Sequence, residues 1–599
     1  MSPSPTRPAP NNIPSEFLCD MKLSNGHGMW VHFLVLFVVL VRCSPPEDPI
    51  QCSSATTQCT VSNSYGSFPD RSICRAGEVV YPTNEEELLA AVAKAAASNR
   101  TMKAATRFSH SIPKLVCPGG DDGLFISIRH LNRVLGVDKN AATMTVESGV
   151  LLRELIDGAA DAGLALTQTP YWWGLTIGGL LSTGAHGSSL WGRGSAVHDY
   201  IVGLRIVTPA SAEEGYAKVR SVGFQHTELN AVRVSLGVLG IISQVTLKLE
   251  PLFKRSISYV EASDSDLGDK AVEFGHQHEF GDISWYPSQR KVVYRIDNRV
   301  SSDVPGNGVY DFIGFRPTPT AALAFIRTTE EVREASSDAG GKCMDSAITV
   351  ATLVASGYGL TNDGIWLTGY PVVGYQSKLQ ASGGCLDSLE DAGLTACPWD
   401  PRIKGVFFHQ TTVSIRLSQA KNFIQDVQQL RDIAPEAMCG LDLYSGILLR
   451  YVRASSAYLG EQEDGVDFDF TYYRSKDPME PRLHEDVLEE IEQMAIFKYG
   501  GLPHWGKNRN VAFKGVKDKY KKIGEFLKVK EAYDPLGLFS SEWTDQILGI
   551  YGVPIIANEG CALEGLCICS DDKHCAPEKG YYCRLGKIYK DARVCTRLI

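Results

Sequence analysis

A glycine-rich stretch from Gly174 to Gly194 holds the densest set of residues that could do chemistry. Small residues leave no bulk between the main chain and a ligand, so a flat or charged molecule can approach the backbone closely. Hydroxyl groups in this stretch can also donate to phosphate oxygens or ring edges. A tight structural loop is the alternative, although two glycines would suffice for one. The residues predicted to bind a ligand here are Gly178, Gly179, Ser182, Thr183, Gly184, His186, Gly187 and Ser188.

Two shorter segments add to this set. Residues 107–111 follow a predicted strand, and their small–His–Ser turn can aim backbone N–H groups at a diphosphate while presenting an imidazole. Residues 235–242 contain glycines that imply close packing on a backbone or a ring, and a buried strand turn explains them nearly as well. The residues predicted to bind a ligand are Arg107, Ser109, His110, Ser111, Gly240, Ile241 and Ile242.

A fourth segment, residues 503–507, contains His504 and Lys507. Gly501 to Lys507 also fits the opening of a phosphate loop, but Asn508 stands where a magnesium-binding hydroxyl is needed. No dinucleotide fingerprint and no nucleophile elbow is present. The pair His276-x-His278 could bind a metal, but a solvated loop is the simpler interpretation, and we predict no metal site.

Taken in order, these segments resemble the vanillyl-alcohol-oxidase-type flavoproteins. Within that family the chain is similar to the sugar-1,4-lactone oxidases, and most of all to plant L-gulonolactone oxidases. The resemblance covers about residues 70–550. It rests on the small–His–Ser turn, Gly-Gly-x-x-Ser-Thr-Gly-x-His-Gly from Gly178, Gly-x-x-Gly-Ile-Ile from Gly237, and His-Trp-Gly-Lys from His504. Each motif alone is weak, whereas the combination is specific.

The resemblance implies an α+β fold, in which a two-subdomain, PCMH-type domain binds FAD and an α+β substrate or cap domain covers the flavin. It implies that His110 stands where these enzymes often bond the flavin covalently, which would tune its potential and retain it. It also implies that Lys507 stabilises negative charge near the flavin, that His504 reaches the active site as a candidate base, and that Arg450 grips the lactone oxygens.

The chain departs from the family pattern at two places. Arg107-Phe108-Ser109 replaces the usual Gly-x-Gly, so the backbone must approach the diphosphate differently there. Leu448-Leu449-Arg450 replaces Glu-x-Arg, so the arginine is kept while a carboxylate is lost.

The expected activity is oxidation of a sugar lactone to L-ascorbate, with hydride transfer to FAD and with dioxygen or another acceptor. The alternatives are a secreted carbohydrate oxidase, a cytokinin-type dehydrogenase, and a flavin-retaining protein that binds cell-wall glycan through its C-terminal module. A panel of substrates distinguishes the three enzyme activities. Lack of turnover together with intact glycan binding would favour the glycan-binding protein.

Strands and helices must position these residues. A capping box at Thr83–Glu86 and helical periodicity predict a helix before the 107–111 turn, and Leu151 to Ala162 predicts another, closed by Gly163. Leu417 to Ile433 and Glu485 to Tyr499 also predict helices. Strands are expected at residues 79–82, 102–106, 125–128, 142–147, 200–208, 232–249, 283–286 and 406–415.

The predicted organisation has five parts. These are a signal peptide with an N-terminal extension (1–43), a linker (44–68), the FAD-binding domain (69–250), the substrate domain (251–550) and a Cys-rich module (556–599). The apolar segment from Met29 to Val41 is shorter than the ~20 residues of a membrane helix, so we expect a cleaved secretory signal, with an uncleaved anchor as the alternative.

The bulk composition is typical of a soluble globular protein. The 599 residues are 44% hydrophobic and 21% charged, with a net charge of −10, which disfavours nucleic acid as a partner. Six of the 16 cysteines lie between Cys561 and Cys595, which predicts a disulfide-stapled module, and zinc is the weaker alternative because no Cys-x-x-Cys occurs. We expect an extracellular or secretory-lumen location, no stable membrane span, and a glycan at the sequon of Asn99.

Overall fold

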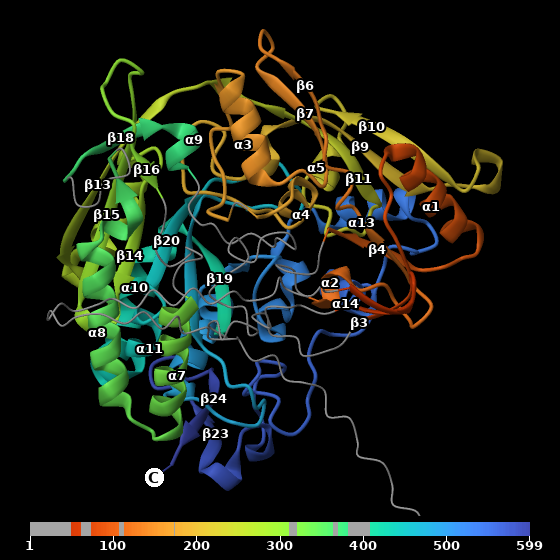
Figure 1. Ribbon diagram of the computed structural model, residues 1–599. Coiled ribbons are helices and arrows are strands. Elements are labelled where there is room, and N and C mark those ends of the chain that lie inside the picture. Colours follow the sequence, from red (N-terminus) through yellow and green to blue (C-terminus); the bar gives the residue numbers. More distant parts are fainter. Residues whose placement is uncertain are drawn as a thin grey trace, which may run out of the picture.

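The computed structural model describes residues 50–61, 74–106, 113–172, 174–310, 320–362, 369–380 and 408–598. Its architecture is α+β, as predicted: two five-stranded sheets form an N-terminal half, and one eight-stranded sheet, called the large sheet, forms the other half (Figure 1). One apolar core continues from the second N-terminal sheet into the large sheet, so the two halves pack as one body.

The first N-terminal sheet has the order β1-β2-β3-β5-β4, with β3, β5 and β4 parallel. Helix α1 connects β3 to β4 and buries Leu88 and Val92 against the sheet. Asn84 caps α1 by accepting from the N–H of Glu87, one residue later than the predicted capping box. The bounds are β1 (Ile50–Ser54), β2 (Thr57–Val61), β3 (Cys74–Val80), α1 (Glu85–Ala97), β4 (Met102–Ala105), α2 (Pro113–Val116) and β5 (Leu124–Ser127).

The second N-terminal sheet has the order β10-β9-β11-β7-β6 and is antiparallel. The strand predicted over residues 232–249 is shorter, because Val232 ends helix α5 and β11 begins only at Ile241. The bounds are β6 (Val134–Asp138), β7 (Thr143–Glu147), α3 (Leu152–Asp161), β8 (Leu164–Ala165), α4 (Ile177–Ser182), β9 (Ile201–Pro209), β10 (Ala217–Gly223), α5 (Leu229–Val232), β11 (Ile241–Lys248) and β12 (Glu250–Pro251).

The large sheet has the order β18-β13-β15-β14-β20-β21-β19-β22. Helix α10, predicted with the correct bounds, packs beside α6 and buries Phe423 against Phe468 and Phe470 of β21. The bounds are β13 (Lys254–Ser263), α6 (Leu267–Gln277), β14 (Asp282–Tyr286), β15 (Lys291–Val300), β16 (Val309–Tyr310), α7 (Thr320–Ala335), α8 (Ala339–Ala355), β17 (Leu360–Thr361), β18 (Val372–Tyr375), α9 (Gln376–Leu379), β19 (Phe408–Arg416), α10 (Leu417–Ile433), α11 (Cys439–Asp442), β20 (Ile447–Val452), β21 (Gly465–Tyr473) and β22 (Leu502–Pro503).

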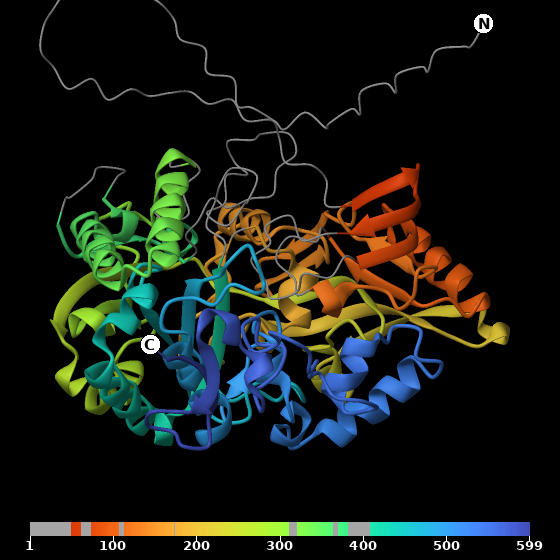
Figure 2. The same ribbon diagram turned by 90° about the horizontal axis from the view of Figure 1, so that it is seen from below.

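The C-terminal part of the chain returns to both halves. Helix α12 (Glu485–Gln493) ends in a π-helical turn, Met494–Lys498, within the predicted helix. Helices α13 (Ile523–Tyr533) and α14 (Glu542–Leu548) then reach the N-terminal half, where Met102 donates its N–H to Leu538 O at 2.7 Å. The last strands, β23 (Tyr581–Leu585) and β24 (Arg593–Arg597), lie beside α12 and far from β1–β3 (Figure 2).

Disulfides occur where the sequence predicted a stapled module. The six C-terminal cysteines pair as Cys561–Cys567, Cys569–Cys583 and Cys575–Cys595. Elsewhere in the described ranges the bonds are Cys52–Cys59, Cys74–Cys117 and Cys343–Cys439, a pairing that spacing alone did not give. Within these ranges no helix combines the length and apolar character needed to cross a bilayer. The predicted signal segment lies outside the described residues.

Candidate active site

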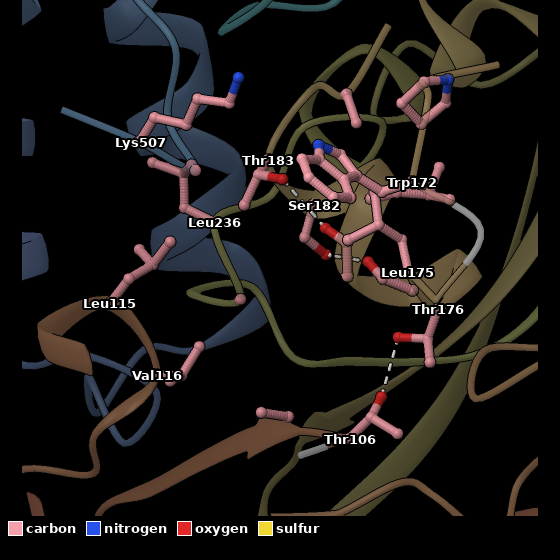
Figure 3. A pocket seen from close by; sticks show the side chains of 18 of the residues that line it. Thr106, Leu115, Val116, Trp172, Leu175, Thr176, Ser182, Thr183, Leu236 and Lys507 are labelled. Atoms are coloured by element: carbon pink, nitrogen blue, oxygen red, sulfur yellow. Dashed lines mark hydrogen bonds between the residues drawn. The ribbon is translucent and has the colours of Figure 1, made fainter. Parts of the chain in front are cut away.

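A cavity of about 220 Å³ opens between the N-terminal half and the large sheet. One wall is made of small residues from β4, from α4 and from the loop before β11, and the opposite end is polar and charged. Figure 3 shows Lys507 on one side of this cavity, with Trp172, Ser182 and Thr183 facing it. The predicted site residues that line it are Gly178, Gly179, Ser182, Thr183, His186, Gly240, Ile241, Ile242, Arg450, His504 and Lys507.

The hydroxyl groups of the glycine-rich segment are engaged by the protein itself. Ser182 donates to Gly178 O at 2.8 Å and Thr183 donates to Gly179 O at 3.1 Å, so both bond back to the preceding turn of α4. The hydroxyl hydrogens are therefore used by the backbone of α4, and the Ser182 oxygen also accepts from the hydroxyl of Ser235 at 3.3 Å. Thr176, which precedes α4, bonds Thr106 directly after β4 at 2.8 Å and so ties the start of α4 to the first N-terminal sheet (Figure 3).

Three predicted residues of this segment lie outside the cavity lining: Gly184, Gly187 and Ser188. Gly187 is required for packing, because a Cβ there would lie 2.8 Å from Thr169 O. Ser188 is buried, donates to Gly281 O at 2.6 Å and accepts from the N–H of Tyr451 at 3.0 Å. Ser188 therefore joins the glycine-rich segment to the large sheet.

The same junction continues along β20. The N–H of Ser189 donates to Tyr451 O at 2.8 Å, and the hydroxyl of Ser195 donates to the same oxygen at 3.0 Å. Tyr451 follows Arg450, so the strand that delivers Arg450 to the cavity is hydrogen-bonded to the segment that forms the opposite wall.

The loop before β11 approaches the cavity through its glycines. Gly237 has φ +63° and open space where a Cβ would stand. Gly240 has φ +137°, and a Cβ there would lie 2.4 Å from Val207 O, so only glycine fits. Leu236 donates its N–H to Ser182 O at 3.0 Å, which ties this loop to α4.

The charged end of the cavity is built from three strands and the 504–507 segment. Lys507 Nζ lies 2.7 Å from an oxygen of Asp469, and Arg450 Nη2 lies 3.3 Å from the same oxygen. Gln410 donates to the other oxygen of Asp469 at 3.1 Å. The Arg450 guanidinium also stands 5.8 Å from the ring of Tyr171, and its Nε has no acceptor among the described residues. The cluster thus places the ammonium of Lys507, fixed by Asp469, and the Nε–H donor of Arg450 at this end of the cavity.

Asp469 supplies a carboxylate where the sequence predicted that one was lost. It is the cross-strand partner of Leu448, the residue that stands in place of the expected glutamate, and directly opposed residues share a face of the sheet. Asp467 and Asp469 were missed as site residues. They alternate with Phe468 and Phe470 on β21, a strand that the sequence analysis did not predict, and this alternation was the signal that could have found them.

A histidine–aspartate pair supports the cluster from behind. His186 places Nδ1 2.9 Å from Gly187 O and Nε2 2.9 Å from an oxygen of Asp467. Arg450 lies 3.3 Å from that same oxygen. Burial would raise the pKa of Asp467, but His186 and Arg450 outweigh it and hold the pKa well below its ordinary range. Asp467 is therefore a fixed negative charge.

Burial favours the neutral form of both His504 and Lys507. Burial, together with the nearby His186 and Lys507, lowers the pKa of His504 well below its ordinary value. The Nδ1 of His504 accepts from the N–H of Gly506 at 3.0 Å, so a neutral ring carries its hydrogen on Nε2. Burial also lowers the pKa of Lys507, and the carboxylate of Asp469 opposes that decrease.

The predicted residues Arg107, Ser109, His110 and Ser111 lie outside the described residues. The residues on both sides of them, Thr106 and the Leu115–Val116 pair of α2, line the cavity.

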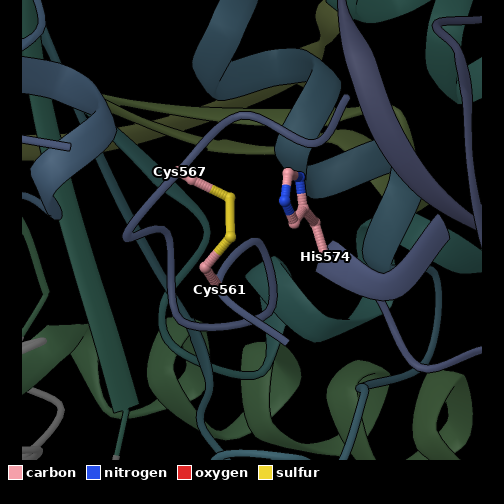
Figure 4. A group of neighbouring side chains, drawn as sticks. All are labelled: Cys561, Cys567 and His574. Atoms are coloured by element: carbon pink, nitrogen blue, oxygen red, sulfur yellow. A yellow bond between two sulfur atoms is a disulfide. The ribbon is translucent and has the colours of Figure 1, made fainter. Parts of the chain in front are cut away.

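The weaker zinc interpretation of the C-terminal module can be compared with its geometry. Cys561, Cys567 and His574 lie close together, but the two sulfurs are bonded to each other (Figure 4). A disulfide offers no thiolate to a metal. His574 Nδ1 accepts from the N–H of Ser570 at 3.2 Å, which gives that ring a structural partner.

Comparison with known proteins gives consistent matches along the chain. The family models that match are an FAD binding domain (residues 76–213), D-arabinono-1,4-lactone oxidase (404–547) and an L-gulonolactone oxidase 2-like C-terminal domain (558–597). A solvent-stable cholesterol oxidase shares the fold, with a TM-score of 0.62 and 15% identity over 85% of this chain and 100% of that one.

Curated relatives are much closer in sequence. Probable L-gulonolactone oxidase 6 of Arabidopsis thaliana is 60% identical over 569 residues, which cover 95% of this chain and 94% of that protein. L-gulonolactone oxidase 3 of the same plant is 50% identical over 94% of this chain and 96% of its own length. L-gulono-1,4-lactone dehydrogenase of Mycobacterium tuberculosis (strain CDC 1551 / Oshkosh) is 26% identical over 81% and 99%. The chain therefore belongs to the L-gulonolactone oxidase family and is an FAD-dependent oxidoreductase.

Proposed function

We propose that this enzyme oxidises L-gulono-1,4-lactone or a related aldonolactone at the hydroxyl-bearing carbon next to the lactone carbonyl. That carbon loses a hydride, and its hydroxyl loses a proton, which gives a keto-lactone that tautomerises to L-ascorbate. Dioxygen then takes up two electrons and two protons and leaves as hydrogen peroxide. The printed names of the relatives and the lactone oxidase model over residues 404–547 support this substrate class.

One observation carries the proposal: a single cavity joins a wall of small residues to a charged cluster. The small wall suits a flat ring, because Gly179 and Gly237 leave the main chain accessible, and a Cβ at Gly237 would meet nothing within 4 Å. FAD, when bound there, supplies the hydride acceptor. The residues proposed to hold it are Gly178, Gly179, Ser182, Thr183, His186, Gly240, Ile241 and Ile242.

Lys507 supplies positive charge where the reaction develops negative charge. Its ammonium is mostly buried beside Asp469, whose carboxylate favours the charged form and fixes the position of the ammonium. A preorganised cation in a site shielded from water stabilises developing charge more than the same cation in solvent. Lys507 is therefore the residue whose loss should cost the most activity.

Arg450 and His504 bind the substrate in this proposal. The Nε of Arg450, for which the described part of the chain holds no acceptor, is a buried donor that a lactone oxygen can satisfy. His504 was predicted as a candidate base, but Gly506 occupies its Nδ1 lone pair, so the geometry favours a donor role for Nε2–H. The hydroxyl proton then passes to water.

The experiment adds L-gulono-1,4-lactone to the purified holoenzyme without oxygen and follows the flavin absorbance. Bleaching by the lactone, with oxygen uptake and peroxide release on aeration, is the expected result. Bleaching by glucose or by isopentenyladenine alone would replace the proposal with the carbohydrate oxidase or cytokinin dehydrogenase alternative. Lys507→Met should retain flavin and lose turnover.

We also propose that His110 is bonded covalently to the flavin. Thr106, just before residues 107–112, and Leu115, shortly after them, both line the cavity, which supports the proposal that this segment lies near the ring. Acid precipitation should leave flavin in the pellet for the natural protein and in the supernatant for His110→Ala. Flavin in the supernatant for both would show a non-covalent site.

We propose an extracellular or secretory-lumen location. Six disulfides among the described residues support an oxidising compartment, and the exposed Asn99, two residues after the end of α1, supports glycosylation of its sequon. Expression in plant cells, with assay of the medium and a glycosidase gel shift, tests both points.

A further inference from the structure

The C-terminal disulfide module, residues 556–598, is packed onto helix α12 through buried polar contacts. The carboxylate of Glu490 is fully buried and accepts from three consecutive backbone N–H groups, those of residues 587–589, at 2.6, 2.6 and 2.7 Å. Gln493 pairs with the backbone of Arg593 in both directions, donating at 2.8 Å and accepting at 3.1 Å. Contacts of this kind fix the module in one orientation, because each leaves a buried polar group unsatisfied if it breaks.

A second set of contacts comes from the small loop 561–567, which the Cys561–Cys567 disulfide closes. Leu563 O accepts from Arg482 at 3.2 Å, and the carboxylate of Glu564 pairs with Arg474 at 2.7 Å. Both arginines are buried and belong to the chain between β21 and α12. The loop is thus held on the same side of the molecule as the segment that carries Lys507.

The loop also touches that segment directly. The carbonyl of Gly565 accepts from the N–H of Val511 at 3.0 Å. A Cβ on Gly565 would lie 2.6 Å from Nε of Arg509, which is fully buried and bonded to Glu489 at 2.7 Å. Arg509 is two residues from Lys507, so the backbone that presents the ammonium is in contact with the module.

On its other side the same segment is attached to β19. Asn508 donates to Thr412 O at 2.9 Å and accepts from the N–H of Thr412 at 2.9 Å, while His504 donates its N–H to that carbonyl at 3.1 Å. Residues 504–511 are therefore clamped between a strand of the large sheet and the C-terminal module.

We infer that the C-terminal disulfide module is a positioning element for the active site, which holds residues 504–511 through Gly565 and thereby fixes Lys507 in the cavity. This inference rests on the proposed function in taking Lys507 as a site residue. The prediction that the module contacts cell-wall glycan concerns its outer face and stays a prediction.

The test compares two glycine-to-alanine variants within the module. Gly565 and Gly580 both have left-handed φ angles, +64° and +80°, so alanine strains the backbone at both. At Gly565 the new methyl group meets the buried Arg509, whereas at Gly580 its nearest neighbour is Leu598 O at 3.3 Å, close to the C-terminus. Only Gly565→Ala should disturb the Lys507 segment.

Two measurements are made on each holoenzyme: amide hydrogen exchange of residues 504–511, and the pH profile of kcat/KM. Gly565→Ala should exchange faster in that segment by about tenfold or more, and the alkaline limb of its profile should move, while Gly580→Ala matches the natural protein in both. Equal exchange and equal profiles for the two variants would overturn the inference.

Hydrogen exchange is read without turnover, which separates this inference from the proposed function. Faster exchange in Gly565→Ala alone supports the clamp even if no lactone is oxidised, whereas loss of lactone oxidation by Lys507→Met tests the function. If Gly565→Ala does not fold, Glu564→Gln replaces it, because this change keeps the loop and removes only the negative charge that pairs with Arg474. Glu564→Gln must change both the exchange rate and the pH profile in the direction expected for Gly565→Ala, or the inference fails.

Discussion

Replacing Asp469 with asparagine removes the charge that faces Lys507 and Arg450 while keeping the shape of the side chain. The ammonium of Lys507 lies 2.7 Å from the carboxylate, and the two side chains are 14% and 10% exposed, so solvent screens the pair weakly. Two unit charges about 4 Å apart attract by about 4 kcal/mol at an effective dielectric constant of about 20. Truncating one member of a buried charge pair costs about 2–5 kcal/mol.

The sign of the pH effect follows from the same contact. Burial lowers the pKa of Lys507 and Asp469 opposes this, so the asparagine variant lowers the pKa further. Activity that needs a charged ammonium is present below this pKa and is lost as pH rises through it. The alkaline limb of kcat/KM should therefore move to lower pH. A loss of about 3 kcal/mol corresponds to roughly 100-fold in kcat/KM on the alkaline side, and the deficit should narrow in acid.

The assay is kcat/KM for the lactone across the pH range, with flavin absorbance confirming that each variant holds FAD. Asp469→Glu should restore the alkaline limb, and Asp432→Asn, at a half-exposed surface carboxylate, serves as the control. If Asp469→Asn lowers kcat/KM by the same factor at every pH, then Asp469 does not act through the charge of Lys507 and the reasoning is refuted.

Three further predictions concern stability. Burial raises the pKa of Asp442 to about 8, so between the pKa of an unfolded aspartate and pH 8 the folded protein holds a proton that the unfolded chain has released, and the free energy of unfolding falls as pH rises. The stability advantage of Asp442→Asn over the natural protein should therefore grow by roughly 3 kcal/mol between about pH 5.5 and 8 in denaturant titrations. An advantage that does not change with pH would contradict this. Ser188→Ala should cost about 1–3 kcal/mol by leaving the buried N–H of Tyr451 unsatisfied, and an unchanged unfolding midpoint would argue against that role. Breaking Cys343–Cys439 with two serines should cost about 2–4 kcal/mol in the same titration, and equal free energies of unfolding with and without the bond would contradict this.

Periodicity located the elements whose packing is local. Leu417 to Ile433 buries one stripe on the large sheet, so the apolar spacing gave both ends of α10. The strand expected from Val232 failed because its apolar residues include the buried side chains of α5 and of the loop that follows. Apolar character there reflects burial against α4 and β11, and burial alone does not distinguish a strand from a loop.

The sequence predicted those residues of the candidate site that belong to local motifs. Glycine density placed α4 in the cavity, and the His-Trp-Gly-Lys segment placed Lys507 there. Asp469 escaped notice because its partners, Lys507 and Arg450, are distant in sequence and meet it only through strand pairing. Ser188 was predicted to bind a ligand because a serine hydroxyl next to a glycine can bond either a ligand or a neighbouring strand. The structure shows that this hydroxyl accepts from the N–H of Tyr451 in β20.

The hydrogen bonds between β20 and the glycine-rich segment constrain how new specificities can arise in this scaffold. Tyr451 receives two donors from that segment and gives one to it, directly beside Arg450. A mutation that reshapes the substrate end by shifting this strand also shifts the wall opposite, so selectivity and cofactor retention would change together. Directed evolution of a new lactone preference should therefore accept substitutions at side chains such as Gln410, whose strand lies two places from β20, more readily than backbone changes in β20 itself.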